Sequence, residues 1–207
     1  MKYELNWDNC YTRYNPSIWN AILSLILHSA KTYDQTLMFR TTIRYPERPY
    51  PNCNDYIVNF LDSIKKSFKR DGYKPLCLWV KEFGKESIVG NHHFHIWWAL
   101  NIEAPLNPFI LKPIAEHFWG LAIGDNASGL VNIDRLDIPG THSPYGIMLS
   151  KDTYNPAWII SQIGYKAMYL AKTDSKEFYA QDDRSWSVSQ VPRMAMDETN
   201  KALLSLC

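Results

Sequence analysis

Hydrophobic residues along the chain recur at two spacings, one typical of helices and one typical of strands. The helical spacing, with apolar residues three or four positions apart, predicts amphipathic helices over residues 16–28, 55–70, 108–121 and 156–172. Runs of β-branched and aromatic residues bounded by turn-forming residues predict strands over residues 36–45, 76–81, 93–100 and 130–138. This order favours an α+β fold with a central, mainly antiparallel β-sheet and flanking helices.

Local signals indicate where two of these elements begin or pair. Asn15 followed by Pro16 is typical of a helix start, with asparagine as the N-cap and proline in the first turn. The strands over 76–81 and 93–100 are separated by the glycine-containing segment EFGKESIVGN. This separation favours an antiparallel hairpin.

Length and composition are typical of one compact unit. The chain has 207 residues, 46% of them hydrophobic, which suffices for a substantial core. We expect a single domain over 1–207, with an N-terminal helical extension (about 1–33), a core (about 34–176) and a C-terminal tail (177–207). The net charge of +1 excludes a uniformly polycationic protein that coats nucleic acid, but it does not exclude local basic patches.

The cysteines and the apolar runs bear on the cellular compartment. The four cysteines show no CxxC spacing, and the polar N-terminus MKYELNWDNC does not resemble a secretory signal. The most apolar run, over 21–27, is much shorter than the roughly 20 residues that a membrane span requires. These features predict a cytoplasmic protein with reduced thiols and no membrane partner.

The stretch NHHFHIWWAL places three histidines within four positions of a predicted strand. Alternation along the strand puts His93, His95 and Trp97 on one face, and His92 on the other. Residues two apart on a strand lie roughly 6 to 7 Å apart, so His93 and His95 can converge on one ion, with Glu82 as the candidate third ligand. A carboxylate with two histidines suits Mg²⁺, Mn²⁺ or another first-row ion. The alternative is that these histidines only form hydrogen bonds at a sheet edge.

The predicted helix over 156–172 carries aromatic and basic residues on its polar side. A pitch of about 100° per residue aligns Tyr165, Tyr169 and Lys172 in one sector, together with Trp158. A phenol is a poor nucleophile unless a cation or metal stabilises its phenolate, and Lys172 is spaced to do this for Tyr169. The alternative is a chance match among 13 tyrosines, with the phenols half buried over the sheet.

A His-hydrophobic-His strand, an acidic residue shortly upstream and a later helix with Tyr-x-x-Lys occur here in one order. That order resembles the HUH endonucleases that start rolling-circle DNA replication. More narrowly, the segments LWVKE, HFHIWWAL and YLAKTDSK look like the filamentous-phage (inovirus) gene-two type of replication protein and its prophage-encoded relatives. FRTTIRYPERP then stands where that family has its first, strand-borne motif. The resemblance spans about residues 37–176.

The resemblance implies a fold, an activity and a set of site residues. The fold would be that of an HUH or Rep nuclease, with an RRM-like or ferredoxin-like core. His93, His95 and Glu82 would bind a divalent cation, Mg²⁺ or Mn²⁺. Tyr169 would attack the scissile phosphate of single-stranded or hairpin DNA at a replication origin, with Lys172 assisting. The product would be a 5′-phosphotyrosine link and a free 3′-hydroxyl.

The chain departs from the commonest pattern of this family in two respects. Tyr165 lies one helical turn before Tyr169. Because some relatives use two alternating tyrosines, Tyr165 is a candidate second nucleophile or a DNA-stacking residue. No Walker-type motif GxxxxGK[ST] is present, so no ATP-driven helicase domain is predicted, and a helicase of the host or of the element is the expected partner.

Candidate DNA contacts are basic residues, for phosphates, and aromatic residues, for base stacking. The basic candidates are Arg40, Arg44, Lys65, Lys66, Lys69, Arg70 and Lys166. The aromatic candidates are Trp97, Trp158 and Tyr165. The alternative is that the stretch KKSFKR is the solvated end of a helix and that the tryptophans belong to the core.

Three further kinds of protein are compatible with parts of this pattern. The same chemistry also drives transposition and plasmid mobilisation, so a transposase or a relaxase-type strand transferase would share these motifs. A DNA-binding module could keep the fold without cleaving DNA. A mononuclear metal enzyme such as a cupin-like oxygenase also uses HxH and a glutamate, but it requires a glycine-rich all-β pattern, against which the predicted helices argue.

Overall fold

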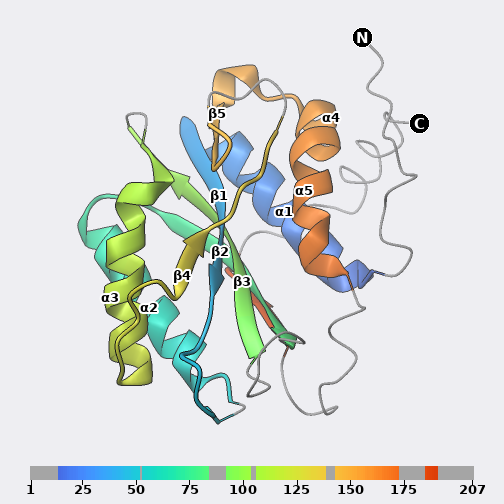
Figure 1. Ribbon diagram of the computed structural model, residues 1–207. Coiled ribbons are helices and arrows are strands. Elements are labelled where there is room, and N and C mark those ends of the chain that lie inside the picture. Colours follow the sequence, from blue (N-terminus) through green and yellow to red (C-terminus); the bar gives the residue numbers. More distant parts are fainter. Residues whose placement is uncertain are drawn as a thin grey trace.

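The computed structural model describes residues 14–51, 53–83, 92–103, 106–138, 143–172 and 185–190 (Figure 1). Its helical segments are α1 (Pro16–Thr32), α2 (Asp55–Arg70), η2 (Pro108–Leu111), α3 (Lys112–Ile123), η3 (Lys151–Thr153), α4 (Pro156–Ile159), η4 (Ile160–Gly164), α5 (Tyr165–Met168) and η5 (Tyr169–Ala171). Its strands are β1 (Gln35–Ile43), β2 (Pro75–Phe83), β3 (His92–Asn101), β4 (Val131–Ile133), β5 (Ile147–Ser150) and β6 (Trp186–Val188). The predicted α+β class, with an antiparallel sheet and flanking helices, is confirmed.

The strands form one antiparallel sheet. Its order is β4-β1-β3-β2-β6, and β5 pairs with the first half of β1 while β4 pairs with the second half. β2 and β3 form the predicted hairpin, and the linker between them lies largely outside the described residues. The continuous pairing of β1 and β2 with β3 fixes which side chains of the three strands lie next to one another.

Four elements differ from the pattern expected from the sequence. The strand predicted over 130–138 is only three residues long, because the chain then leaves β1 and the Leu136 N–H donates to the Pro144 carbonyl instead. β5 and β6 were not predicted, since strands of four and three residues are too short to show a clear alternation. The first helix extends past the predicted end at His28, because Ser29 and Ala30 are also buried.

Helices cover both faces of the sheet (Figure 1). α1 and the helical run over 156–171 pack on one face, together with Trp97, while α2 and α3 pack on the other, together with Trp98. Neighbouring residues of a strand point to opposite faces, so both faces of the central strands are apolar. Among the described segments, no helix has the length and apolar character needed to cross a membrane.

Candidate metal centre

The residues predicted as metal ligands meet at one end of the sheet. In the antiparallel register Glu82 of β2 lies opposite His93 of β3, and Thr42 of β1 lies opposite His95. These positions fall on the face that α1 and the helical run over 156–171 cover, because they alternate in step with the buried residues of that layer. The hairpin itself therefore brings the carboxylate to the two imidazoles, as the sequence predicted.

His92 takes the opposite side of the sheet, as predicted from strand alternation. Its ring packs edge-on against the rings of Tyr45 and Phe94, with centroids 5.0 and 5.2 Å away. The three closely spaced histidines are thus divided into an aromatic-core residue and a pair that shares one face.

Three ligand atoms of Glu82, His93 and His95 form a compact triangle. Nε2 of His95 lies 2.7 Å from Oε2 of Glu82, Nε2 of His93 lies 3.5 Å from the same oxygen, and the two Nε2 atoms are 3.1 Å apart. Two atoms that bind one ion at about 2.1 Å and at right angles lie about 3.0 Å apart. The group is therefore close enough to bind a metal ion, and its size fits one face of an octahedral site.

The chemistry of these three atoms also fits a cation. A carboxylate only accepts hydrogen bonds, and a neutral imidazole that donates through Nδ1 has only a lone pair on Nε2. Such atoms repel one another at 2.7 to 3.5 Å unless a proton or a cation lies between them. A divalent cation neutralises all three lone pairs at once.

Burial and charge set the protonation of this group. Glu82 is almost completely buried. Burial alone would raise the pKa of its carboxyl group. When a proton and not a cation lies between the groups, hydrogen bonds from His93 and His95 and the charge of Lys172 outweigh burial and hold the pKa of Glu82 well below its usual range. Burial also lowers the pKa of His95. An ionised carboxylate and a neutral imidazole are the forms that bind metal ions.

Tyr169 lies against this triangle. Its hydroxyl donates to Oε2 of Glu82 at 3.5 Å, and its ring is edge-on to the ring of His95, with centroids 5.2 Å apart. Two cations face the phenol ring, since Nζ of Lys172 lies 4.0 Å and the guanidinium carbon of Arg40 lies 4.8 Å from its centre. The predicted proximity of Lys172 to Tyr169 is confirmed, and Arg40 adds a second positive charge from β1.

Lys172 connects the phenol to the carboxylate. Its Nζ lies 3.1 Å from Oε1 of Glu82, which leaves Oε2 to face the histidines. Burial would lower the pKa of Lys172, but hydrogen bonds with Tyr169 and Glu82 raise it, so the side chain remains a cation. The sequence pattern placed Lys172 in the helix, and this prediction is wrong. The helix ends at Ala171, and the backbone of Lys172 is extended and forms an antiparallel bridge with Tyr14.

The helical run that carries Tyr169 contains a π-helical turn over Ile160–Gly164. At this turn the helix comes close to α1, where a Cβ on Gly164 would lie 3.2 Å from the ring of Trp19. The absence of a side chain at Gly164 thus allows the two helices to approach. A wider turn of this kind shifts the positions that follow it and often occurs at functional sites.

Tyr165 is placed differently from Tyr169. It is 37% exposed, and Nζ of Lys166 lies 6.0 Å from the centre of its ring. Within the described parts of the chain, the Tyr165 hydroxyl makes no hydrogen bond with Glu82 or with the histidine pair. The structure therefore brings Tyr169, and not Tyr165, to the candidate metal ligands.

Two side chains that the sequence pattern did not single out complete the surroundings of His95. Oγ1 of Thr42 lies 2.8 Å from Nδ1 of His95 and 2.9 and 2.8 Å from the two carboxylate oxygens of Asp134. Asp134 also accepts a hydrogen bond from Nε of Arg40 at 2.6 Å. The sequence could have indicated Thr42, because it lies two residues after Arg40 on the predicted strand and therefore shares its face. It gave no indication of Asp134, which follows the three-residue strand β4.

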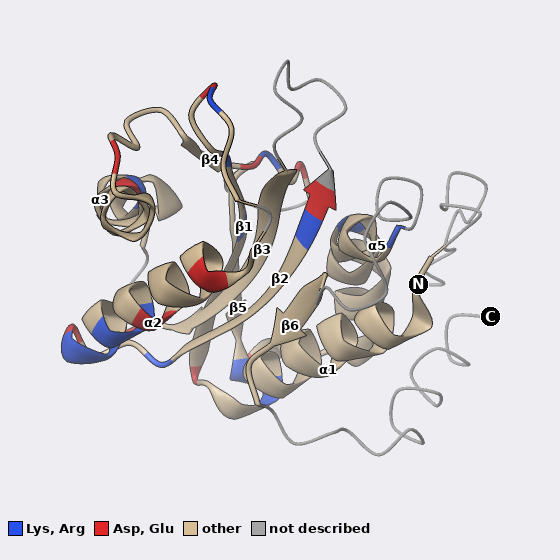
Figure 2. Ribbon diagram, turned by 90° about the horizontal axis from the view of Figure 1, so that it is seen from below, with Lys and Arg blue, Asp and Glu red and all other residues tan. Residues whose placement is uncertain are grey.

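The predicted phosphate contacts on α2 lie apart from Tyr169. Lys65, Lys66, Lys69 and Arg70 belong to the C-terminal part of α2, on the opposite face of the sheet from α5 (Figure 2). Arg44 is exposed just after the end of β1. DNA binding by these residues stays a prediction.

The prediction that Trp97 stacks on DNA bases is wrong. Its side chain is fully buried, with 0% of its surface exposed, in the core between the sheet and α1. The reason is strand alternation, since two residues beyond His95 the same face of β3 already lies under the helices. Trp158 is half buried and packs against the same core.

Trp97→Ala is expected to lower the free energy of unfolding by about 3–5 kcal/mol, because it removes a large side chain from a fully packed site. Urea unfolding followed by circular dichroism measures this change. A variant that kept the wild-type stability but lost affinity for single-stranded DNA would place Trp97 on a DNA-binding surface instead.

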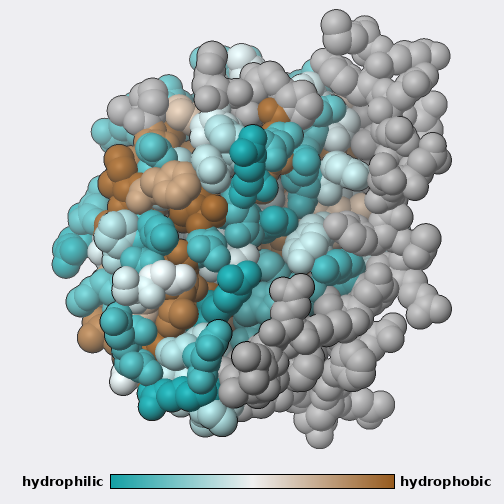
Figure 3. Space-filling view, in the orientation of Figure 1, coloured by the Kyte–Doolittle hydropathy of each residue, from teal (hydrophilic) through white to brown (hydrophobic). Residues whose placement is uncertain are grey.

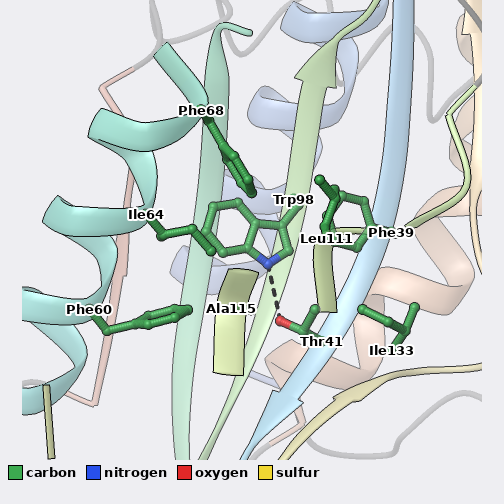
Figure 4. A pocket seen from close by; sticks show the side chains of 9 residues that line it. All are labelled: Phe39, Thr41, Phe60, Ile64, Phe68, Trp98, Leu111, Ala115 and Ile133. Carbon is green, nitrogen blue, oxygen red and sulfur yellow. Dashed lines mark hydrogen bonds between the residues drawn. The ribbon is translucent and has the colours of Figure 1, made fainter. Parts of the chain in front are cut away.

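The layer of α2 and α3 offers no substrate site of comparable chemistry among the described residues. A cavity of about 10 Å³ lies between these helices and the sheet, no larger than one water molecule. Its lining is apolar except for the Thr41 hydroxyl, which accepts a hydrogen bond from Nε1 of Trp98 at 3.0 Å (Figure 4). On the surface, apolar atoms gather over α3 and η2 (Figure 3), where Ile110 and Leu121 are exposed.

Comparison with family models, with curated proteins and with solved structures gives no match to this chain. The resemblance to the HUH endonucleases therefore stays a prediction from motif order. The geometry of Glu82, His93, His95 and Tyr169 is the observation from which a function is proposed.

Proposed function

We propose that the protein is a metal-dependent endonuclease that nicks single-stranded DNA at a specific sequence and transfers the strand through a 5′-phosphotyrosine intermediate. The observation that carries this proposal is the contact of the Tyr169 hydroxyl with Glu82, the carboxylate that also faces His93 and His95. A nucleophile beside a candidate metal ligand is one arrangement that supports covalent phosphoryl transfer.

Glu82, His93 and His95 would hold the ion, and Mg²⁺ or Mn²⁺ fits this mixed carboxylate and imidazole set. When bound, such an ion neutralises phosphate oxygens and polarises the phosphorus. Oε1 of Glu82 is already held by Lys172, so the carboxylate would offer the ion one oxygen. The partly exposed His93, with 21% of its side-chain surface accessible, gives the site an open side for DNA.

The protein's own residues account for the covalent step. The phenol oxygen of Tyr169 would form a bond to the phosphorus, and the bond from phosphorus to the 3′ oxygen would break. The phenol loses its proton and the departing 3′ oxygen gains one, so the products are a 5′-phosphotyrosine and a free 3′-hydroxyl. Lys172 and Arg40, both close to the phenol ring, would bind the charged phosphate as it approaches.

Initiation of rolling-circle replication of a phage, plasmid or other mobile element is the biological role that this chemistry supports. The phosphotyrosine conserves the energy of the broken bond, so the strand can be rejoined later without ATP. The site of action would be the host cytoplasm, with DNA at a replication origin as substrate and a helicase as partner. A transposase or relaxase-type strand transferase would use the same residues in the same way.

A cupin-like oxygenase and a DNA-binding module without cleavage are less well supported by this geometry. A cupin-like oxygenase belongs to a double-sheet β fold, whereas here one sheet carries helices on both faces. A DNA-binding module has no need for a tyrosine hydroxyl beside a buried carboxylate that a lysine and two imidazoles also contact. The geometry therefore favours an enzyme.

The test is incubation of the protein with a random-sequence pool of single-stranded DNA, in Mn²⁺ or Mg²⁺ and, in parallel, in EDTA. We expect a protein–DNA adduct that survives denaturation, forms only with metal and yields one preferred sequence when the captured DNA is read. The released fragment should be extended by a polymerase at its 3′-hydroxyl. A released fragment with a 3′-phosphate, or no adduct at any concentration of metal, would contradict the proposal.

A further inference from the structure

We propose that Thr42 and Asp134 are positioning residues that hold His95 in the one tautomer able to bind a metal ion through Nε2. This inference rests on the metal-binding part of the proposed function. It assigns to two side chains a role that they exert through His95, and Asp134 is in addition paired with Arg40.

The hydrogen bonds between these three residues have one consistent direction. Oγ1 of Thr42 lies within 2.9 Å of both carboxylate oxygens of Asp134 and 2.8 Å from Nδ1 of His95. A carboxylate can only accept, so the single hydrogen of the Thr42 hydroxyl is donated to Asp134. The hydroxyl oxygen is then left to accept, and Nδ1 of His95 must carry the hydrogen that it donates.

This direction decides the state of the other ring nitrogen. A neutral imidazole carries one hydrogen, so a hydrogen on Nδ1 leaves a lone pair on Nε2. That atom is the one that lies 2.7 Å from Glu82 and 3.1 Å from the Nε2 of His93. We call the hydrogen bonds from His95 to Thr42 and from Thr42 to Asp134 the relay. The relay leaves the lone pair of His95 on Nε2, the atom that faces Glu82 and His93.

The surroundings hold the relay in place. Thr42 and His95 are 4% and 6% exposed, so water competes little for their hydrogen bonds. Asp134 is fixed from two sides, because its backbone N–H donates to the Arg40 carbonyl at 2.8 Å and its carboxylate accepts from Nε of Arg40 at 2.6 Å. Outer hydrogen bonds of this kind orient metal-ligating histidines and raise their affinity for the ion.

The test is calorimetric titration of Mn²⁺ into the wild type and three variants. Thr42→Val is isosteric and removes the hydroxyl, so Mn²⁺ affinity is expected to fall about 10- to 100-fold. Thr42→Ser restores the hydroxyl and is expected to restore the affinity. Thr41→Val is the matched control, because Thr41 is equally buried but its hydroxyl serves Trp98 on the opposite face, so stability falls while Mn²⁺ affinity stays.

A spectroscopic measurement keeps the inference testable if a variant fails to fold. In metal-free wild-type protein, nitrogen NMR is expected to show a hydrogen on Nδ1 of His95. A lone pair on Nδ1, or a Thr42→Val variant with wild-type Mn²⁺ affinity, would overturn the relay and leave the metal centre intact. Failure of the wild type to bind Mn²⁺ would overturn the proposed metal centre itself, and the relay with it.

Discussion

Tyr169→Phe is expected to reduce covalent joining of DNA to the protein at least about 1,000-fold, because removal of a nucleophile removes the reaction path itself. The phenylalanine ring can keep the contacts with Arg40, Lys172 and His95 that the phenol ring makes. Only the hydroxyl beside Glu82 is lost. Folding and metal binding should therefore be unchanged, and the rate of adduct formation on labelled single-stranded DNA isolates the chemical step.

Tyr165→Phe is the matched control, since it removes the same atom one helical turn earlier. Tyr165 is exposed and lies beside Lys166 rather than beside the metal ligands, so the first covalent joining should continue at close to the wild-type rate. If Tyr165 is a second nucleophile for the later rejoining step, its variant should accumulate the adduct. An adduct at full yield in the Tyr169→Phe protein would move the nucleophile to Tyr165.

His93→Ala is expected to remove both metal binding and cleavage. Loss of a direct ligand should cost more than the roughly 10- to 100-fold in affinity that loss of an outer partner costs. His93 is the more exposed histidine of the pair, with 21% of its side chain accessible against 8% for His95, so this variant is the one expected to fold. Calorimetry with Mn²⁺ measures the affinity, and the adduct assay measures the activity.

The control for this variant is His117→Ala. His117 lies on α3, in the layer on the other face of the sheet, so Mn²⁺ affinity and adduct formation should both equal those of the wild type. Excess EDTA should reproduce the effect of His93→Ala in the wild-type protein. Cleavage by His93→Ala at the wild-type rate, without added metal, would show that the site does not act through an ion.

The parts of the fold that the sequence predicted are those with long, regular patterns. The bounds of α2 follow from an apolar stripe up to Phe68 and from the turn at Asp71-Gly72. The β2–β3 hairpin follows from two long strands joined by a glycine-containing linker. The alternation of buried residues on the two strands restricts the register of such a hairpin, so the position of Glu82 near the start of the histidine strand could be inferred from the sequence. The separation of His92 from the pair follows from alternation.

Features that depend on tertiary contacts could not be inferred from local pattern. The π-turn over Ile160–Gly164 lies where Gly164 packs on Trp19, and a regular pitch of about 100° per residue does not include such a turn. Asp134 meets His95 only because β4 pairs with β1, a contact between distant segments. Trp97 was misassigned because composition alone does not tell which end of a strand lies under a helix.

Peptide mapping of the covalent adduct tests the central claim most directly. Trypsin cleaves after Lys151, Lys166 and Lys172, so Tyr165 falls in the peptide 152–166 and Tyr169 falls in the peptide 167–172. After nuclease digestion, mass spectrometry should find the remaining nucleotide phosphate on the peptide 167–172, which contains Tyr169 as its one tyrosine. A nucleotide found instead on the peptide 152–166, or on no tyrosine at all, would contradict the assignment of Tyr169 as the nucleophile of a metal-dependent DNA nickase.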